Sequence, residues 1–203
     1  MGTVRQALDG MSRDGILVRA LRRGWRFGSL AWQDVIDTIE IRTMFESEVL
    51  RRAGTRIPQA VLVGLKGETE SVLENIDCLS EHERRLADYH FHSTLAENSA
   101  SAVLIDLIKP LIRRSMYAGM TCPPEKRHRA RSFREHVTIL DALRGDAPAA
   151  IEQLQAHVSR TLQDSLRPLV APGAQAENRF ETMQEVSARH LSRRSAVDVP
   201  DSR

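Results

Sequence analysis

Apolar residues recur at helical spacing along most of the chain. Between residues 34 and 167 they return every three or four positions, without the alternation that is typical of strands. The stripes expected to face a core include Ile41, Phe45 and Val49, and later Leu104, Leu107 and Leu111. The pattern predicts six helices, near 34–53, 57–78, 81–97, 100–119, 124–144 and 147–167.

The fold class that follows is an all-α antiparallel bundle. Gly145 and Asp146 leave a short turn between the last two helices, which should therefore be antiparallel neighbours. A polar tail over 169–203 should be largely mobile, although Phe180, Met183 and Val186 could form one more helix. The bundle should have six or seven helices.

The first 28 residues follow a different pattern. Apolar positions at helical spacing over 4–11 predict a helix, which should end near Gly15 because glycine suits a C-terminal cap. The period then changes to two over 16–19 and 25–28, on either side of a turn at 21–24. We predict a helix followed by a short β-hairpin.

Composition narrows the class of protein. The chain has 203 residues, 41% of them hydrophobic, enough to bury a core. Neither a membrane span nor a signal peptide is evident, so we expect a cytoplasmic protein that does not bind membranes. Residues 1–33 contain six arginines and two aspartates, a net charge of +4, so the remainder carries −2. A basic first segment suggests a polyanionic partner.

The stretch ADYHFH at 87–92 contains the first candidate ligands. At about 100° per residue, Asp88 and His92 lie about 40° apart on one helical face, whereas His90 lies about 200° from Asp88. Leu95 continues the face of Asp88 and His92 one turn later. That face should point into the bundle, and His90 should point away from it.

Two later histidines also lie on apolar faces. His136 shares a face with Phe133 and Leu140, and His157 shares one with Leu154. Both lie about 15 Å from the Gly145 turn at 1.5 Å per residue, so they should come abreast. Three inward histidines and Asp88 would give a donor set of three nitrogens and one oxygen. Spacing alone leaves open the alternative of core histidines bonded to carbonyl oxygens.

Cysteine adds no second type of metal site. Cys78 and Cys122 are far apart and lack paired spacing, which favours isolated structural thiols over a disulfide framework or a thiolate zinc site.

The N-terminal sequence TVRQALDGMSRDGILVRALRRGWRFG resembles the second half of the winged helix-turn-helix of GntR-family transcription regulators. The resemblance implies that Thr3 and Arg5 begin the DNA-facing side of the recognition helix and that Arg23 and Gly24 form the tip of the wing. The family domain places two more helices before this point. We therefore expect a truncated gene model or fragment, with a partial winged helix-turn-helix.

The rest of the chain resembles the FCD domain, the helical effector-binding domain of FadR-type GntR regulators. The resemblance is carried by IEIRTMFE, DYHFH and EHVTILDALRGDAPAAIEQLQAHV, in the family's order. It implies metal ligation by Asp88, His92, His136 and His157. It also implies that Arg42 faces the cavity and meets a carboxylate of Asp88 or of a ligand; the alternative is a surface ion pair with Glu46. Ser101 stands where the family often has Asn, which would alter the pocket locally.

Together these patterns predict the following organisation: a partial DNA-binding domain at 1–28, a linker at 29–33, an FCD-like domain at 34–168 and the tail at 169–203. We expect a ligand-responsive regulator that acts as a homodimer on operator DNA. Its cofactor would be a divalent metal: the ligands suit zinc, nickel and manganese about equally on chemistry alone, and zinc is the first expectation. Positions left open on the metal would suit a small carboxylate or hydroxy-acid effector, and binding would act on the DNA-binding part through the linker.

Two other functions fit the same residues. One is a metal- and effector-binding dimerisation module without DNA binding. The other is a metallohydrolase, which needs a general base beside an open metal position. Glu135 adjoins His136 but points about 100° away from it. We therefore do not expect an enzyme.

Overall fold

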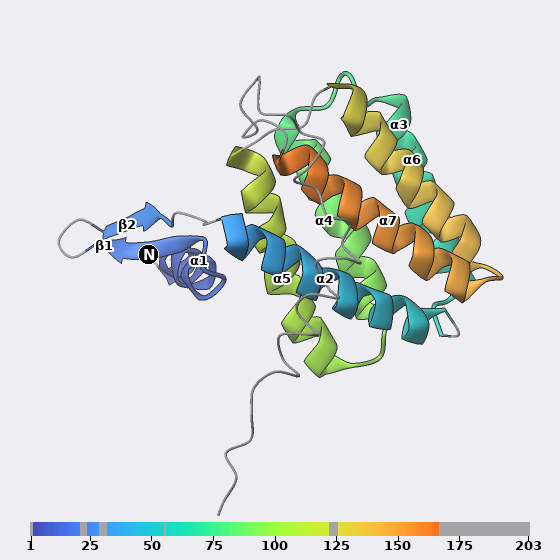
Figure 1. Cartoon of the computed structure of the whole chain (residues 1–203), viewed down its shortest axis with the longest axis horizontal. Helices are drawn as coiled ribbons and strands as arrows, with labels where there is room; N and C mark the ends of the chain where they lie inside the picture. Colours follow the sequence, from blue (N-terminus) through green and yellow to red (C-terminus); the bar gives the residue numbers. More distant parts are fainter. Residues whose placement is uncertain (1, 21–23, 29–31, 55, 122–125, 167–203) are drawn as a thin grey trace, which may run out of the picture. The chain divides into compact units, whose positions relative to one another are not determined.

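A computed structural model describes residues 2–20, 24–28, 32–54, 56–121 and 126–166. The tail at 169–203, with its expected extra helix, and Arg23 lie outside these residues. Seven helices are formed within them: α1 (Gly2–Arg13), α2 (Trp32–Ala53), α3 (Gln59–Glu74), α4 (Glu81–Glu97), α5 (Ala102–Thr121), α6 (Lys126–Leu143) and α7 (Ala147–Leu166). Strands β1 (Leu17–Ala20) and β2 (Gly24–Phe27) form one antiparallel hairpin. The predicted helical bundle preceded by a helix and hairpin is confirmed (Figure 1).

The cap between α1 and β1 depends on Gly15. This residue has φ of +75°, in the left-handed region that glycine adopts without steric cost. Its N–H donates to the Ser12 carbonyl, and the Ile16 N–H reaches back to the Met11 carbonyl at 2.9 Å. These bonds satisfy carbonyls at the helix end. The chain then turns into β1, whose Val18 pairs with Arg26 of β2.

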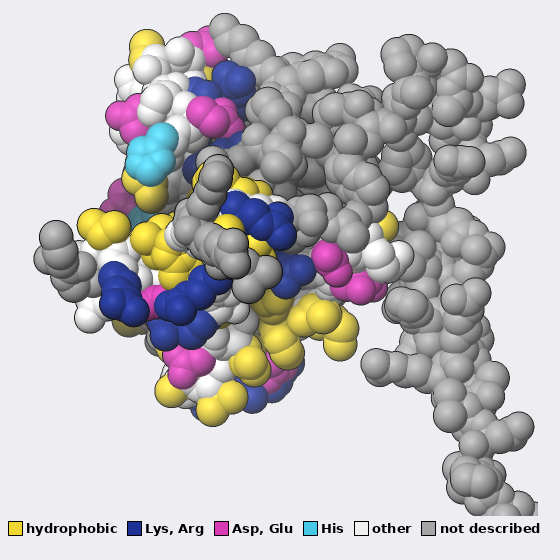
Figure 2. All heavy atoms as spheres, turned by 90° about the vertical axis from the view of Figure 1, so that its left-hand side faces the viewer, with side chains coloured by type: hydrophobic (Ala, Val, Ile, Leu, Met, Phe, Trp, Pro, Cys, Tyr) yellow, Lys and Arg dark blue, Asp and Glu magenta, His cyan; other side chains and the backbone are white. Residues whose placement is uncertain are grey.

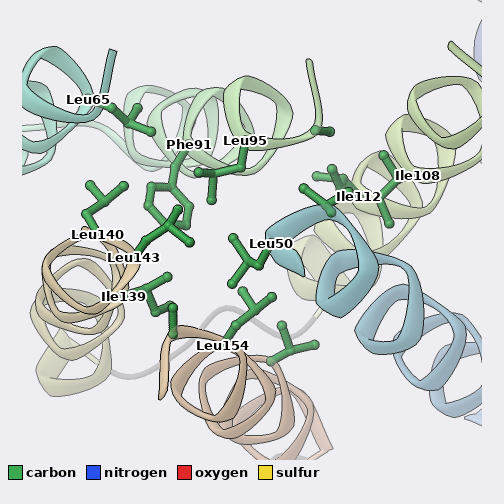
Figure 3. Close-up of a cluster of buried hydrophobic side chains, with 14 of the residues drawn as sticks. Leu50, Leu65, Phe91, Leu95, Ile108, Ile112, Ile139, Leu140, Leu143 and Leu154 are labelled. Atoms are coloured by element: carbon green, nitrogen blue, oxygen red, sulfur yellow. The ribbon is translucent and has the colours of Figure 1, made fainter. Parts of the chain in front are cut away.

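Side chains from six helices, α2 to α7, form the core of the bundle. Helix α2 packs against α5 and α7, α3 packs against α6, and α4 packs against α5. Figure 3 shows the result: aliphatic side chains from facing helices surround Phe91. The most buried of these include Leu50, Phe91, Ile108, Ile112, Ile139, Leu140 and Leu154. This core fixes the spacing of the helices that carry the candidate ligands.

Two of the predicted apolar stripes were partly wrong. Ile41 is 42% exposed and Leu107 49% exposed, whereas Ile39 and Ile108 are buried. The inward face of α2 also carries buried polar side chains, among them Arg42. A stripe chosen from apolar residues alone is therefore rotated away from the face that packs.

Helix α3 ends at Glu74, four residues before the predicted end. Asn75 is its C-terminal cap, and the Asn75 side chain donates to the Ser71 carbonyl at 2.9 Å. Asn side chains compete for backbone hydrogen bonds in this way and so favour helix ends. The N–H groups of Cys78 and Leu79 then bond to the Asn75 carbonyl in a turn.

Helix α5 also contacts the N-terminal segment, within the single compact unit formed by residues 1–166. The Arg113 guanidinium donates to both carboxylate oxygens of Asp14, at 2.6 and 3.1 Å. The Tyr117 hydroxyl donates to the Gly28 carbonyl at 3.0 Å, and its ring stacks on Phe27. None of the described helices has the length and apolar character needed to cross a membrane.

A candidate metal centre between three helices

The four predicted ligands come from helices α4, α6 and α7. Helix α4 begins with a capping box, in which the Ser80 hydroxyl accepts from the Glu83 N–H and the Glu83 carboxylate accepts from the Ser80 N–H. The reciprocal bonds fix where the helix starts. Seven and eleven residues after Glu81, Asp88 and His92 then lie one turn apart on the same face.

The turn between α6 and α7 sets the other two ligands side by side. The N–H groups of Gly145 and Asp146 donate to the Ala142 carbonyl, and Asp146 Oδ1 accepts from the Ala149 N–H at 2.9 Å. One helix therefore ends and the next begins within three residues. His136 and His157 come abreast, with their Nε2 atoms 3.2 Å apart.

The ligand atoms converge on one point. One donor atom from each of Asp88, His92, His136 and His157 lies within 4.8 Å of the other three. Asp88 Oδ1 is 3.5 Å from His136 Nε2 and 3.8 Å from His92 Nε2. Two ligands at 2.0–2.1 Å from a tetrahedral zinc ion stand about 3.3 Å apart. The three histidines are buried and the Asp88 side chain is 25% exposed.

The charge states of these histidines suit a cation. Burial lowers the pKa of His136 well below its usual value, and His157, His92 and Arg42 lower it further. Burial also lowers the pKa of His157, although the hydrogen bond to Glu135 acts in the opposite direction. Both rings are therefore neutral near pH 7, the form that binds metals.

Three buried ring nitrogens of the cluster have no hydrogen-bond partner among the described residues: Nδ1 and Nε2 of His92, and Nδ1 of His136. The two facing Nε2 atoms of His136 and His157 can share one proton at most. A divalent cation between the four side chains would satisfy the lone pairs of the Nε2 atoms and offset the charge of Asp88. The residues thus fit a metal.

Glu135 belongs to this site, although the sequence pattern was used only to reject it as a general base beside His136. Its Oε2 lies 2.8 Å from His157 Nδ1, and its Oε1 accepts from Arg160 Nε at 2.7 Å. Burial by itself would raise the pKa of Glu135, but the bond to His157 and the nearby arginine lower it overall. The helical wheel missed this contact because Glu135 points away from His136 of its own helix and toward the histidine of the next.

Arg42 forms an ion pair with a carboxylate, as expected. The carboxylate is that of Glu46, and the pair lies in the protein interior. Arg42 Nε donates to Glu46 Oε1 at 2.7 Å, and Nη1 donates to the Ser115 hydroxyl at 2.7 Å. The expected pairing with Asp88 is not formed. The alternative prediction, a surface ion pair with Glu46, had the correct partner but the wrong location, because both side chains are almost fully buried.

Glu46 connects Arg42 to the histidine cluster. Its Oε2 lies 3.0 Å from His92 Nδ1, close enough for a charge contact, and neither atom forms a hydrogen bond among the described residues. Burial alone would raise the pKa of Glu46, but Arg42 and His92 lower it to about 2. The carboxylate is therefore ionised and held behind His92.

The other predicted residues lie outside the cluster. His90 is 58% exposed and pairs with Glu68, which agrees with its expected outward direction. The Ser101 hydroxyl accepts from the Leu104 N–H at the start of α5. Thr3 and Arg5 are exposed on the first turns of α1, and Gly24 begins β2 with φ of +83°. Arg23 and the linker residues 29–31 are outside the described residues.

Comparison with known sequences gives the family. Residues 37–160 match the family model of the FCD domain. The chain belongs to the FCD domain family. This confirms the resemblance carried by the three motifs. No protein with a curated function matches this FCD chain.

Solved structures share the fold. The metal-free FCD domain of TM0439, assigned as a transcriptional regulator, is 22% identical; the match covers 71% of this chain and 100% of that one, with a TM-score of 0.61. The Zn²⁺-bound form of that domain matches over the same shares with a TM-score of 0.55. A GntR regulator from Rhodococcus sp. RHA1 is 19% identical over 81% of this chain and 79% of that one, with a TM-score of 0.66.

Proposed function

We propose that this FCD protein is a ligand-responsive transcription regulator whose helical domain binds a divalent metal through Asp88, His92, His136 and His157. The observation that carries the proposal is the convergence of these four donor atoms within 4.8 Å. The Zn²⁺-bound FCD structure supports it, because a domain of the same fold holds that ion. Three imidazoles and one carboxylate suit zinc first, and also nickel or manganese.

A small carboxylate or hydroxy-acid is the proposed effector. Four protein ligands leave one or two positions open on a five- or six-coordinate ion, where a carboxylate oxygen could bind. Arg42 supports an anionic effector: its Nη2 group is buried without a partner among the described residues, and its charge is close enough to lower the pKa of His136. Its guanidinium can therefore still donate to a bound carboxylate.

Operator DNA is the proposed partner of the N-terminal segment, in a homodimer. Thr3, Arg5 and Gly24 lie in a helix and hairpin whose predicted recognition surface is exposed. Figure 2 shows several groups of Lys and Arg side chains, among acidic and hydrophobic ones, on the face of the molecule that its view presents. An arginine at the start of a recognition helix can donate two bonds to guanine, which is the chemistry expected of Arg5.

A change at the metal centre could reach α1 through contacts made by α5. Tyr89 follows Asp88 in α4, and its hydroxyl lies 3.3 Å from Arg113 Nη1. The same guanidinium holds Asp14 just after α1. Closure of the helices around an ion would shift this contact and the linker at 29–33, and so the placement of α1. Unchanged operator affinity on saturation with Zn²⁺ and effector would rule this coupling out.

A dimerisation module that binds metal and effector but not DNA is the second candidate function. Val4 of α1 is 70% exposed, so the first turn of the proposed recognition helix has an apolar side that the described residues do not cover, whereas Leu8 and Met11 are half-buried. A helix gains most of its stability from packing of its apolar face. If the chain binds metal but no sequence can be selected with it from random DNA, the result favours the dimerisation module over the DNA-binding regulator.

Metal analysis tests the site directly. The purified chain should carry one divalent ion, and His136→Ala and His157→Ala should each lose it. His90→Ala is the matched control, because His90 lies on the same helix as His92 but pairs with Glu68 at the surface. Retention of stoichiometric metal by both interior variants would exclude the proposed ligands.

A further inference from the structure

Two histidines of the cluster are backed by carboxylates on the side away from the other ligands. His157 Nδ1 lies 2.8 Å from Glu135 Oε2, and His92 Nδ1 lies 3.0 Å from Glu46 Oε2. In both rings Nε2 is the atom that faces the other ligands. The two carboxylates come from different helices, α6 and α2, and neither is among the four predicted ligands.

A carboxylate at Nδ1 decides where the imidazole proton resides. A neutral imidazole carries one N–H, and an ionised carboxylate accepts only, so it holds that proton on the nitrogen nearest to it. The other nitrogen then offers a lone pair. The same contact restrains ring rotation and raises the basicity of the metal-binding nitrogen.

Both carboxylates are themselves held by arginines. Arg160 Nε donates to Glu135 at 2.7 Å, and Arg131 Nε lies 3.6 Å from the same oxygen. Arg42 holds Glu46 and is tied to Ser115. Each pair keeps the negative charge in place and ionised before any cation arrives.

The third histidine is held differently. His136 Nδ1 is buried and has no hydrogen-bond partner among the described residues. Its ring instead stacks on Phe91, with centroids 3.8 Å apart and planes inclined by 5°. Phe91 is the aromatic residue of the DYHFH motif, between Asp88 and His92. Packing therefore fixes the plane of this ring without choosing its tautomer.

We infer that Glu135 and Glu46 are positioning residues of the metal centre: the hydrogen bond to Glu135 fixes the Nδ1–H tautomer of His157, the charge of Glu46 beside Nδ1 favours the same tautomer in His92, and both rings so present Nε2 to the ion, while Phe91 orients His136. This inference rests on the proposed metal-binding function. It adds residues that do not touch the ion but set how strongly it binds.

Glu135→Gln is the main test, since Gln keeps the shape of the side chain but its amide can donate or accept and no longer selects a tautomer. The Zn²⁺ dissociation constant, measured by competition with a chelator, should rise about 10- to 100-fold. Glu46→Gln should act in the same direction. The matched control is Glu68→Gln, which alters an exposed carboxylate–histidine pair and should leave the constant unchanged.

A second measurement does not need the metal. Nitrogen chemical shifts of the metal-free protein should show His157 as the Nδ1–H tautomer, and Glu135→Gln should produce a mixture of tautomers in a folded protein. Unchanged Zn²⁺ affinity in Glu135→Gln would overturn the inference, as would weaker binding with an unchanged tautomer. An equal loss in Glu68→Gln would overturn it too, by attributing the effect to net charge. If the parent chain bound no metal, the proposed function would be excluded. The tautomer of His157 in the metal-free protein would then still show whether Glu135 positions that ring.

Discussion

His136 in the helical bundle and Arg5 on α1 are both polar residues assigned to binding, but they have opposite surroundings. His136 is fully buried among side chains from other helices, whereas Arg5 is exposed. Burial makes the metal centre part of the core, so a change there affects folding and binding together. Because Arg5 is exposed, a substitution there should affect binding of its partner and not folding. The difference predicts which substitutions alter stability.

Arg42→Ala should have the largest effect on stability. It leaves Glu46 as a buried carboxylate without its main cationic partner, and breaking a buried ion pair in this way costs about 3–5 kcal/mol. Urea unfolding of the metal-free protein measures the change. Arg51→Ala is the control on the same helix, because Arg51 pairs with Glu48 at the surface and its loss should be far smaller. Equal losses would remove the distinction between interior and surface pairs.

Metal binding should stabilise the bundle by the next largest amount. A ligand that binds the folded state at a hundredfold excess over its dissociation constant adds about 2.7 kcal/mol. Zn²⁺ should therefore raise the melting temperature of the parent chain and of His90→Ala. It should not do so for His157→Ala. A similar rise in all three proteins would place the ion elsewhere.

Acid should destabilise the metal-free protein in two stages. The pKa values of His136 and His157 are lowered in the folded state, so below about 6.5 the unfolded chain binds more protons and stability falls with pH. Glu46, with its pKa lowered to about 2, adds a further loss as pH falls from about 4.5 toward 2. Between pH 7 and 5.5 we expect a loss of about 1–2 kcal/mol in urea unfolding. A flat profile in this range would mean that the histidines are not buried in neutral form.

Helical periodicity predicted the elements and the inward direction of the histidines, because both follow from positions along one helix. His136 and His157 could also be placed abreast, since a short turn fixes the register of two helices. Glu135 was missed because its partner is on another helix. For Arg42, the alternative to a place in the cavity was an ion pair with Glu46 at the surface, because oppositely charged residues four positions apart in a helix usually lie at the surface. Contacts between helices depend on their rotation and packing, which one sequence pattern does not contain.

Arg5→Ala should have the smallest effect on stability and still alter binding. Its side chain is exposed, and such substitutions usually change stability by less than about 0.5 kcal/mol. Loss of a base or phosphate contact should nevertheless weaken DNA binding by about 1–3 kcal/mol. The measurement is titration of the full chain, with bound Zn²⁺, against a DNA site selected from a random library, at several salt concentrations. Arg134→Ala, an exposed arginine on α6, is the control for net charge. Weaker binding in Arg5→Ala alone, with unchanged unfolding, assigns DNA contact to α1; equal weakening in both variants assigns it to overall charge and counts against α1 as a recognition helix.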